Sequence, residues 1–472
     1  MRSQVIESLS RKLGFWAVTS TAAALFVGVC MAVTPASADS LEQALAATYM
    51  NNPTLNAERA RLRATDEEYA RARAGILPNV DFTSDWGLQN TRTERQNPAL
   101  GSAGTHHPGS YAFTLTQPLF RGLRTLNGLR YAEATINAGR ESLRSVEQDT
   151  LLLAVTAYVD VVRDQAIVGL RENNVKVLSE QLTATKDRFE VGEVTKTDVA
   201  QAEARRAGAT SDLSLAQANL KSSRATYEQV VGRAPSHLTE PPPIESILPN
   251  SLPNALSIGE GENPDIQQAV YLESASAYDI KRIIGETLPE LNLETEYIER
   301  FEPGLTTRRT ENFTVIGRLT VPLYSGGEPS ARVRQARQTR GQRRREIEAA
   351  RVRIRAEVVS AWSQLVAARA RKESAESQVR ANKIALNGVR EEEKVGQRTI
   401  LDVLDAEQEL VDAQVTLVGV RRDLVVASFT LYSAVGRLDA ASLGLAVDFY
   451  DPLEHYKRVR RKLFGFGRRI PN

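Results

Sequence analysis

The chain has 472 residues, with 60 Lys and Arg against 58 Asp and Glu, and a single cysteine. This near-neutral balance gives no support for a nucleic-acid-binding surface, and one cysteine cannot form a disulfide framework. The sequence contains no HExxH, GxSxG, GxxxxGK[ST] or GxGxxG motif, so nothing in it indicates an enzyme, a bound cofactor or a metal site.

The chain begins with a pattern typical of a cleaved secretory signal. Basic residues precede an apolar stretch, Leu13–Val33, which is followed by the A-x-A site Ala36-Ser37-Ala38. We therefore expect residues 1–38 to be a signal peptide; the alternatives are an uncleaved membrane anchor and lipidation at Cys30. Removal of these residues would leave 57 basic and 57 acidic residues. No later segment reaches the roughly 18 consecutive apolar residues of a membrane helix, so any crossing would have to use β-strands.

The rest of the chain is internally duplicated. Gln117–Gly122 recurs as Val321–Gly326 at an offset of 204 residues, and further landmarks downstream keep this offset. Upstream landmarks are 211 residues apart, so the first copy carries seven extra residues, which marks an exposed loop. The expected repeats are 39–234 and 255–450, joined by a Pro-rich linker, 235–254.

Each repeat contains two stretches in which apolar and polar residues alternate. The predicted strands are about 79–89, 110–117, 290–299 and 311–320. Their length and dyad pattern are those of an outer-membrane barrel. The loop Asn90–Gly109 is expected to hold the seven extra residues, and a shorter loop, Arg300–Thr310, joins the second pair. Pro118 and Pro322 are expected to end the strands, where a missing N–H costs little.

A long helical hairpin is expected after each pair of strands. Residues 119–234 and 330–451 lack proline, and their apolar residues step at three and four, which is coiled-coil spacing. The expected hairpins are 119–232, turning at Gly192, and 327–436, turning at Gly396. An unbroken arm of about 70 residues would span on the order of 100 Å.

The chain ends in a basic tail, 451–472. From His455 onward it carries seven Lys and Arg and no acidic residue. The interpretations are a contact with lipid headgroups or peptidoglycan, and an ordinary solvated terminus.

Four strands cannot close a barrel, and an open sheet edge is not viable in lipid, so the chain is expected to oligomerise. Two copies would give eight strands with a filled interior, whereas three would give twelve strands and leave a lumen. A cyclic trimer is therefore the smallest assembly that makes a passage. The alternative function is a non-conducting coiled-coil adaptor or structural protein of the cell envelope.

Three features together resemble the TolC family of outer-membrane efflux channel-tunnels. They are the run Val395–Ala406 (VGQRTILDVLDA), the P-L-[FY]-x-G strand exit and the duplicated layout, and the resemblance covers roughly residues 40–445. It implies a mixed α and β homotrimer with a 12-stranded β-barrel in outer-membrane lipid of a Gram-negative bacterium, continued by a 12-helix periplasmic tunnel. It also implies efflux of small molecules or type I protein secretion. The implied partners are a periplasmic adaptor protein and an inner-membrane transporter of ABC, RND or MFS type.

Candidate gate residues lie at the hairpin tips. Asp402 and Asp405 are three residues apart, so threefold symmetry would gather six carboxylates into a cation-selective ring. In the alternative, Asp402 and its repeat mate Asp198 only cap helix N-termini. The resemblance implies that Arg398 bonds to Asp198 or its vicinity, tying the two hairpins together until an adaptor releases them in an iris-like opening. Glu393 stands where the family's well-known member has Tyr, and it would repel Asp198.

Overall fold

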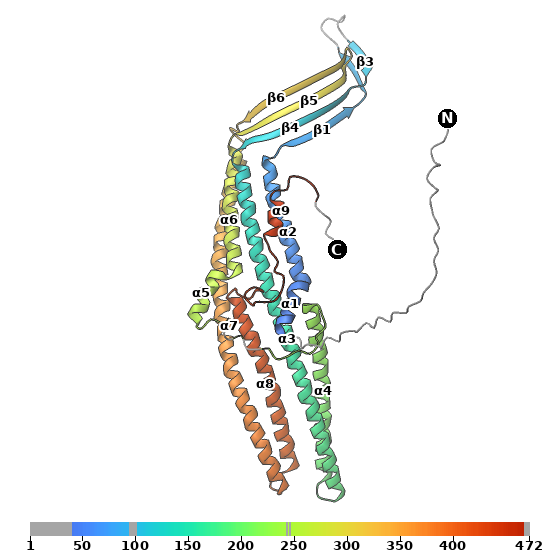
Figure 1. Ribbon diagram of the computed structural model, residues 1–472, viewed down its shortest axis with the longest axis vertical. Helices are drawn as coiled ribbons and strands as arrows, with labels where there is room; N and C mark the ends of the chain where they lie inside the picture. Colours follow the sequence, from blue (N-terminus) through green and yellow to red (C-terminus); the bar gives the residue numbers. More distant parts are fainter. Residues whose placement is uncertain (1–39, 94–101, 242–243, 245–246, 467–472) are drawn as a thin grey trace, which may run out of the picture. The chain divides into compact units, whose positions relative to one another are not determined.

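The computed structural model describes residues 40–93, 102–241, 244 and 247–466, and the expected signal peptide lies outside them. Two similar series of elements follow one another along the chain (Figure 1). The first series is α1 (Leu41–Asn51), α2 (Pro53–Arg73), β1 (Asn79–Trp86), β4 (Gly109–Arg121), α3 (Arg124–Glu190) and α4 (Lys196–Val231). The second series is α5 (Leu252–Glu262), α6 (Pro264–Ile284), β5 (Glu290–Gly304), β6 (Thr307–Thr320), α7 (Glu328–Lys394) and α8 (Ile400–Ala434). The additional elements are β2 (Gln89–Thr93), β3 (Ser102–His106) and α9 (Glu454–Val459).

The duplication extends to the way the short helices are fixed. An Asn-Pro pair starts both α2 and α6, with the Asn as N-cap and the Pro at the first helical position, where no N–H is needed. Each buried Asn also reaches the end of the hairpin's second helix. Asn52 donates to the carbonyl of Val230 at 2.9 Å, and Asn263 donates to that of Ala434 at 3.1 Å. The same residue thus begins one helix and anchors it to another in both copies.

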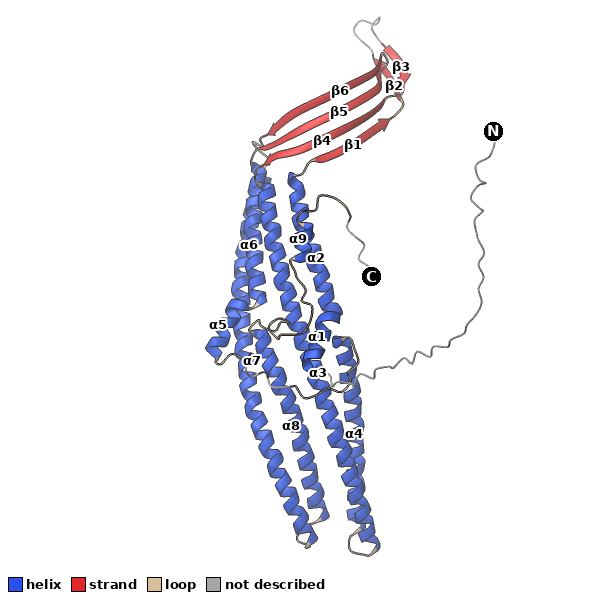
Figure 2. Cartoon of the chain, in the orientation of Figure 1, coloured by secondary structure: helices blue, strands red, loops and turns tan. Residues whose placement is uncertain are grey.

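The four long strands form one antiparallel sheet in the order β1-β4-β5-β6 (Figure 2). The central pair, β4 and β5, comes from different copies and runs from Gly109 opposite Phe301 to Arg121 opposite Glu290. The two copies therefore meet in the middle of the sheet. β1 and β6 form its edges, so within the described part of this chain each has a strand partner on one side only.

The loop predictions need correction. Residues 90–109 are not all loop, because β2 and β3 form a second antiparallel sheet there, from Gln89 opposite His106 to Thr93 opposite Ser102. The second loop, expected over Arg300–Thr310, is shorter than predicted. β5 continues to Gly304 and β6 begins at Thr307, since the ladder persists beyond the apolar alternation that the prediction used.

Pro118 lies inside β4 rather than after it. The β1 ladder ends with Asn79 opposite Thr116, so Pro118 lies beyond the last β1 partner, and the β5 pairing shifts register between Pro118 and Phe120. A missing N–H at an irregularity breaks no regular ladder bond. Pro322 follows the end of β6.

One face of the sheet carries an apolar row that crosses all four strands. In register, this row is Phe82, Phe113, Tyr297 and Phe313. The Phe82 and Phe113 rings lie 4.8 Å apart. The adjacent row, on the opposite face, is Asp81, Thr114, Glu296 and Thr314. One face is thus apolar and the other polar, as the alternation predicts.

The helices join the sheet at one end. Because the strands are antiparallel, the starts of β1 and β5 and the ends of β4 and β6 share that end. The two copies approach closely here, at Gly122 and Gly285. A Cβ at either glycine would collide with the carbonyl oxygen of the other, and Gly122 has φ +57°. Arg121 and Arg124 both pair with Glu290, which connects the copies by charge as well.

The long helices pack through small residues at coiled-coil spacing. On α4 the buried residues Ala202, Ala209, Ala216 and Ser223 are seven apart, and on α7 Ala361, Ala368 and Ala375 repeat the spacing. The main core surrounds the buried Tyr158, Tyr227 and Phe429. The Tyr158 hydroxyl donates to the carbonyl of Thr239 at 2.7 Å and fixes the linker to this core. Among the described residues, no helix is both long enough and apolar enough to cross a membrane.

The basic tail is not simply a solvated terminus over its described part. Its α9 packs against α2, with the rings of Tyr456 and Tyr69 edge to face at 5.5 Å. His455 Nδ1 lies 3.0 Å from Oδ2 of the buried Asp66. A count of basic residues does not reveal the contact of His455 with Asp66 or the contact between the two tyrosine rings.

Candidate functional site

The two hairpin tips are built alike. Gly192 and Gly396 have φ +80° and +77°, a left-handed conformation that favours glycine. The amide of Gly192 donates to the carbonyl of Phe189 at 3.0 Å, and that of Gly396 donates to the carbonyl of Glu393 at 2.9 Å. These bonds close the last turns of α3 and α7 before the chain reverses, so each Val-Gly pair forms the tip turn that the sequence predicts.

Asp198 and Asp402 start the returning helices. The Asp198 carboxylate accepts from the amide of Thr195 at 2.8 Å, and the Asp402 carboxylate accepts from that of Thr399 at 2.9 Å. Each Thr hydroxyl in turn accepts from the Asp amide, which completes a capping box. The backbone hydrogen bonds hold the pKa of both carboxyls below the usual value. Both aspartates therefore cap helix N-termini in this chain, and their role in a gate stays a prediction.

Arg398 has a different partner from the expected one. Its Nε donates to Oε2 of Glu392 at 2.9 Å, a residue of its own hairpin, and this bond raises the pKa of the guanidinium. Among the described contacts, nothing joins Arg398 to Asp198. The reason is local: the tip turn brings Glu392 next to Arg398, while Asp198 is held by its own cap.

Two other ion pairs join the hairpins near their tips. Arg188 on α3 donates through Nη1 to Oε1 of Glu393 on α7 at 2.8 Å. This hydrogen bond is the main cause that raises the pKa of Arg188. Further along, Arg205 on α4 is paired with Asp405 on α8. Glu393 and Asp405 of the second hairpin therefore each bind an arginine of the first hairpin.

Arg188 and Arg205 were not among the gate residues predicted from the sequence. A usable signal was distance from the tip, because Arg188 lies four residues before Gly192 and Glu393 lies three before Gly396. In two hairpins of equal length, residues equally far from the tip lie at similar heights. For Arg205 and Asp405 the distances differ by about one helical turn, so this signal is weaker there.

The tip ion pairs are exposed wholly or in part. The side chains of Arg205 and Asp405 are 41% and 52% accessible, and those of Arg188 and Glu393 are 42% and 18% accessible. Exposed pairs of this kind contribute about 0–1 kcal/mol each. A small apolar cluster adds to them, formed by Leu178, Ala209, Ile400 and Leu404. The tips are thus held together by a few weak contacts.

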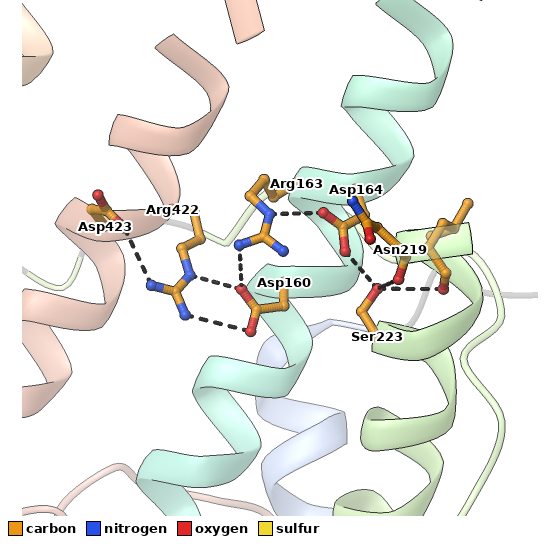
Figure 3. Close-up of polar contacts among 8 residues, drawn as sticks. Asp160, Arg163, Asp164, Asn219, Ser223, Arg422 and Asp423 are labelled. Atoms are coloured by element: carbon orange, nitrogen blue, oxygen red, sulfur yellow. Dashed lines mark hydrogen bonds and ion pairs between the residues drawn. The ribbon is translucent and has the colours of Figure 1, made fainter. Parts of the chain in front are cut away.

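A stronger polar network joins the hairpins nearer the core (Figure 3). Arg422 on α8 contacts both oxygens of Asp160 on α3, at 2.8 and 3.4 Å. Arg163 bridges Asp160 and Asp164, at 3.0 and 2.8 Å. The buried Asp164 accepts from the hydroxyl of Ser223 on α4 at 2.6 Å. One helix is therefore tied to two others about 45 Å from the end of α3, at ~1.5 Å per residue.

Comparison with known proteins places this geometry in a family. The family model described as outer membrane efflux protein matches residues 43–233 and 256–437, one match for each copy. The chain belongs to the outer membrane efflux protein family. The family is one of channels rather than of enzymes, and its members are located in the outer membrane with the helices in the periplasm.

Members of the outer membrane efflux protein family resemble the chain over nearly its whole length. The outer membrane efflux protein BepC of Brucella suis is 40% identical over 94% of this chain and 95% of its own. The outer membrane protein TolC of Vibrio cholerae is 25% identical over 82% of this chain and 88% of its own. The crystal structure of the Campylobacter jejuni CmeC outer membrane channel has a TM-score of 0.75 at 15% identity, covering 89% of each chain. The expected TolC-family membership and duplicated fold are confirmed.

Proposed function

We propose that the protein is the outer-membrane exit duct of an efflux system and that three copies form the duct. Two observations support the trimer. The edge strands β1 and β6 each have one strand partner in the described chain, so β6 of one copy and β1 of the next can pair and close a sheet of twelve strands. On α7, Val352, Val359 and Val366 form an exposed apolar stripe with the seven-residue spacing of a helix interface.

The names of the relatives support a class of cargo. BepC is named an efflux protein, which favours efflux as the function of this chain as well. A duct that begins in the periplasm needs a source of energy in the inner membrane. We therefore expect a periplasmic adaptor and an inner-membrane transporter of ABC, RND or MFS type to deliver cargo at the hairpin tips. Secretion of proteins remains the second cargo class.

The contrast between the two levels of contact carries the gating proposal. The hairpins are tied near the core by Asp160 and Arg422, and at the tips by the partly exposed pair of Arg188 and Glu393 and the exposed pair of Arg205 and Asp405. Releasing weak tip contacts while the upper network holds would swing the tips apart, in the manner of an iris. An adaptor needs to supply only a few kcal/mol of differential contact to shift such an equilibrium.

The test is planar-bilayer conductance of the purified protein, with the oligomeric mass measured on the same sample. Small cation-selective steps from a trimer are expected. A monomer, or a trimer that passes no current even when the tip pairs are removed, would instead favour the non-conducting envelope adaptor.

A further inference from the structure

The described part of the basic tail is fixed to α2 by several kinds of contact. His455 pairs with Asp66, whose side chain is inaccessible and whose pKa burial raises. Tyr456 packs on Tyr69, and the guanidinium of Arg460 lies 5.3 Å from the centre of the Tyr69 ring. A helix of one or two turns has no independent stability, so these contacts determine where the tail lies.

The tail runs along α2 toward the sheet. His455 is beside Asp66, and five residues later the carbonyl of Arg460 accepts from Nη1 of Arg73 at 2.9 Å. Arg73 is the last residue of α2, three residues before Ile76, whose carbonyl accepts from the Gln117 side chain of β4 at 3.0 Å. The tail therefore leaves α2 at the level where the strands begin.

The residues that follow combine positive charge with exposed aromatic rings. They are Arg461, Lys462, Leu463, Phe464, Gly465 and Phe466. The side chain of Phe464 is 90% accessible and that of Phe466 is fully accessible. Aromatic and basic side chains together are typical of segments that lie at a membrane surface, with the rings at the acyl boundary and the cations on phosphates.

We propose that residues 461–466 bind the phospholipid surface of the outer membrane's periplasmic leaflet. Two observations converge: the tail is fixed at the junction of helices and strands, and its exposed side chains suit a lipid headgroup region. In an outer-membrane protein with periplasmic helices, this junction lies on the periplasmic side of the membrane. A six-residue segment extends at most about 20 Å, so the proposal requires the bilayer surface to lie within that distance of Arg460. Peptidoglycan offers no apolar layer for Phe464 and Phe466. The proposal rests on the outer-membrane location and not on conduction.

The experiment measures contact of the tail with lipid directly. In a C30S background, which removes the only cysteine, F464C is labelled with bimane and the protein is placed in nanodiscs of phosphatidylethanolamine and phosphatidylglycerol with brominated acyl chains. Bimane on F464C is expected to be quenched, and bimane on K196C, at a hairpin tip, is not. Equal fluorescence with brominated and ordinary lipids at F464C would overturn the proposal.

A charge reversal distinguishes lipid from the other possible binding partners of the tail. R461E/K462E alters two exposed side chains and is expected to lower the quenching at F464C about twofold in anionic nanodiscs, and raised salt should have a similar effect. If the tail instead binds peptidoglycan or a neighbouring copy, the label will be shielded without lipid quenching. Co-sedimentation with isolated sacculi that R461E/K462E abolishes, in the absence of quenching, would assign the tail to peptidoglycan and refute the lipid proposal.

Discussion

Glu393 shows how the meaning of one charge depends on its neighbours. Considered with Asp198 alone, a carboxylate at this position is repulsive, but Arg188 lies 2.8 Å away and neutralises it. The tip therefore uses an ion pair at the position where the family's well-known member has Tyr. The role of Arg398 changes in the same way, because its partner Glu392 belongs to the same hairpin.

Reversing the charge of Arg188 should favour opening of the duct. In R188E two carboxylates would face each other at the tip, so we expect a higher single-channel conductance or open probability in planar bilayers. The double variant R188E/E393R should return toward the original level. The control is K186E, which breaks a more exposed pair with Glu203 inside one hairpin. R398S is expected to change conductance less than R188E does. If R398S alone increased conductance, the bond of Arg398 that matters would be one between copies of the chain.

Glu147 should make stability depend on pH. It accepts from the amide of Ala440 at 2.8 Å, and burial raises its pKa above the ordinary 4.5. The folded protein then holds this proton more tightly than the unfolded chain does. The stabilising contribution is complete below pH 4.5 and is lost as pH rises through the raised pKa.

The substitution E147Q keeps the acceptor and removes the titration. We expect its Tm to exceed that of the original protein at pH 7.5 and the difference to shrink as pH falls. E172Q, at an exposed position on the same helix, should give no pH-dependent difference. A constant offset between E147Q and the original protein at every pH would contradict the assignment.

At the scale of elements, what the sequence predicts depends on how local the cause is. Strand alternation, the Val-Gly tip turns and the coiled-coil spacing are fixed by neighbouring residues, and the structure contains all three. The β2–β3 pair was missed because polar residues predominate there and give no apolar period. The partners Arg188 and Arg205 were missed because the relative height of two hairpins is set by packing between residues about 200 positions apart.

Because α4 packs closely on one side, its buried and exposed faces should differ strongly in how far a larger side chain lowers Tm. Ala209 is buried at the heptad position that faces α3 and α8, so A209L should overpack the contact and cost about 1–3 kcal/mol. Thermal melting followed by helical circular dichroism should show a lower Tm. A207L, two residues away on an exposed part of the helix, is the matched control. Equal Tm values for the two variants would show that this seam tolerates larger side chains.

At the scale of the whole molecule, the described surface exposes apolar side chains that contact with another copy would bury. The stripe on α7 is the clearest case, with Val352 70% and Val366 50% accessible. Burying a valine contributes about 1.5–3 kcal/mol, so a stripe repeated in three copies would stabilise an assembly substantially.

A charge in the middle of this stripe should disfavour the trimer. We expect V359E to shift the detergent-solubilised protein toward the monomer, as measured by analytical ultracentrifugation. V359L preserves the apolar contact and should remain trimeric. If V359E remained trimeric, the subunit interface would not include Val359.

The β2–β3 pair occurs in one copy only, and this bears on what the duct presents to the cell exterior. A trimer would place six β-hairpins around its axis, and a ligand could not distinguish them if the two copies in each chain were identical. A ring of separate half-length chains could have five or seven members. Because two unequal copies are fused in one chain, the number of β-hairpins is even and every second one carries the β2–β3 pair. In the proposed trimer, a ligand that recognises the β2–β3 pair would therefore find its epitope three times rather than six.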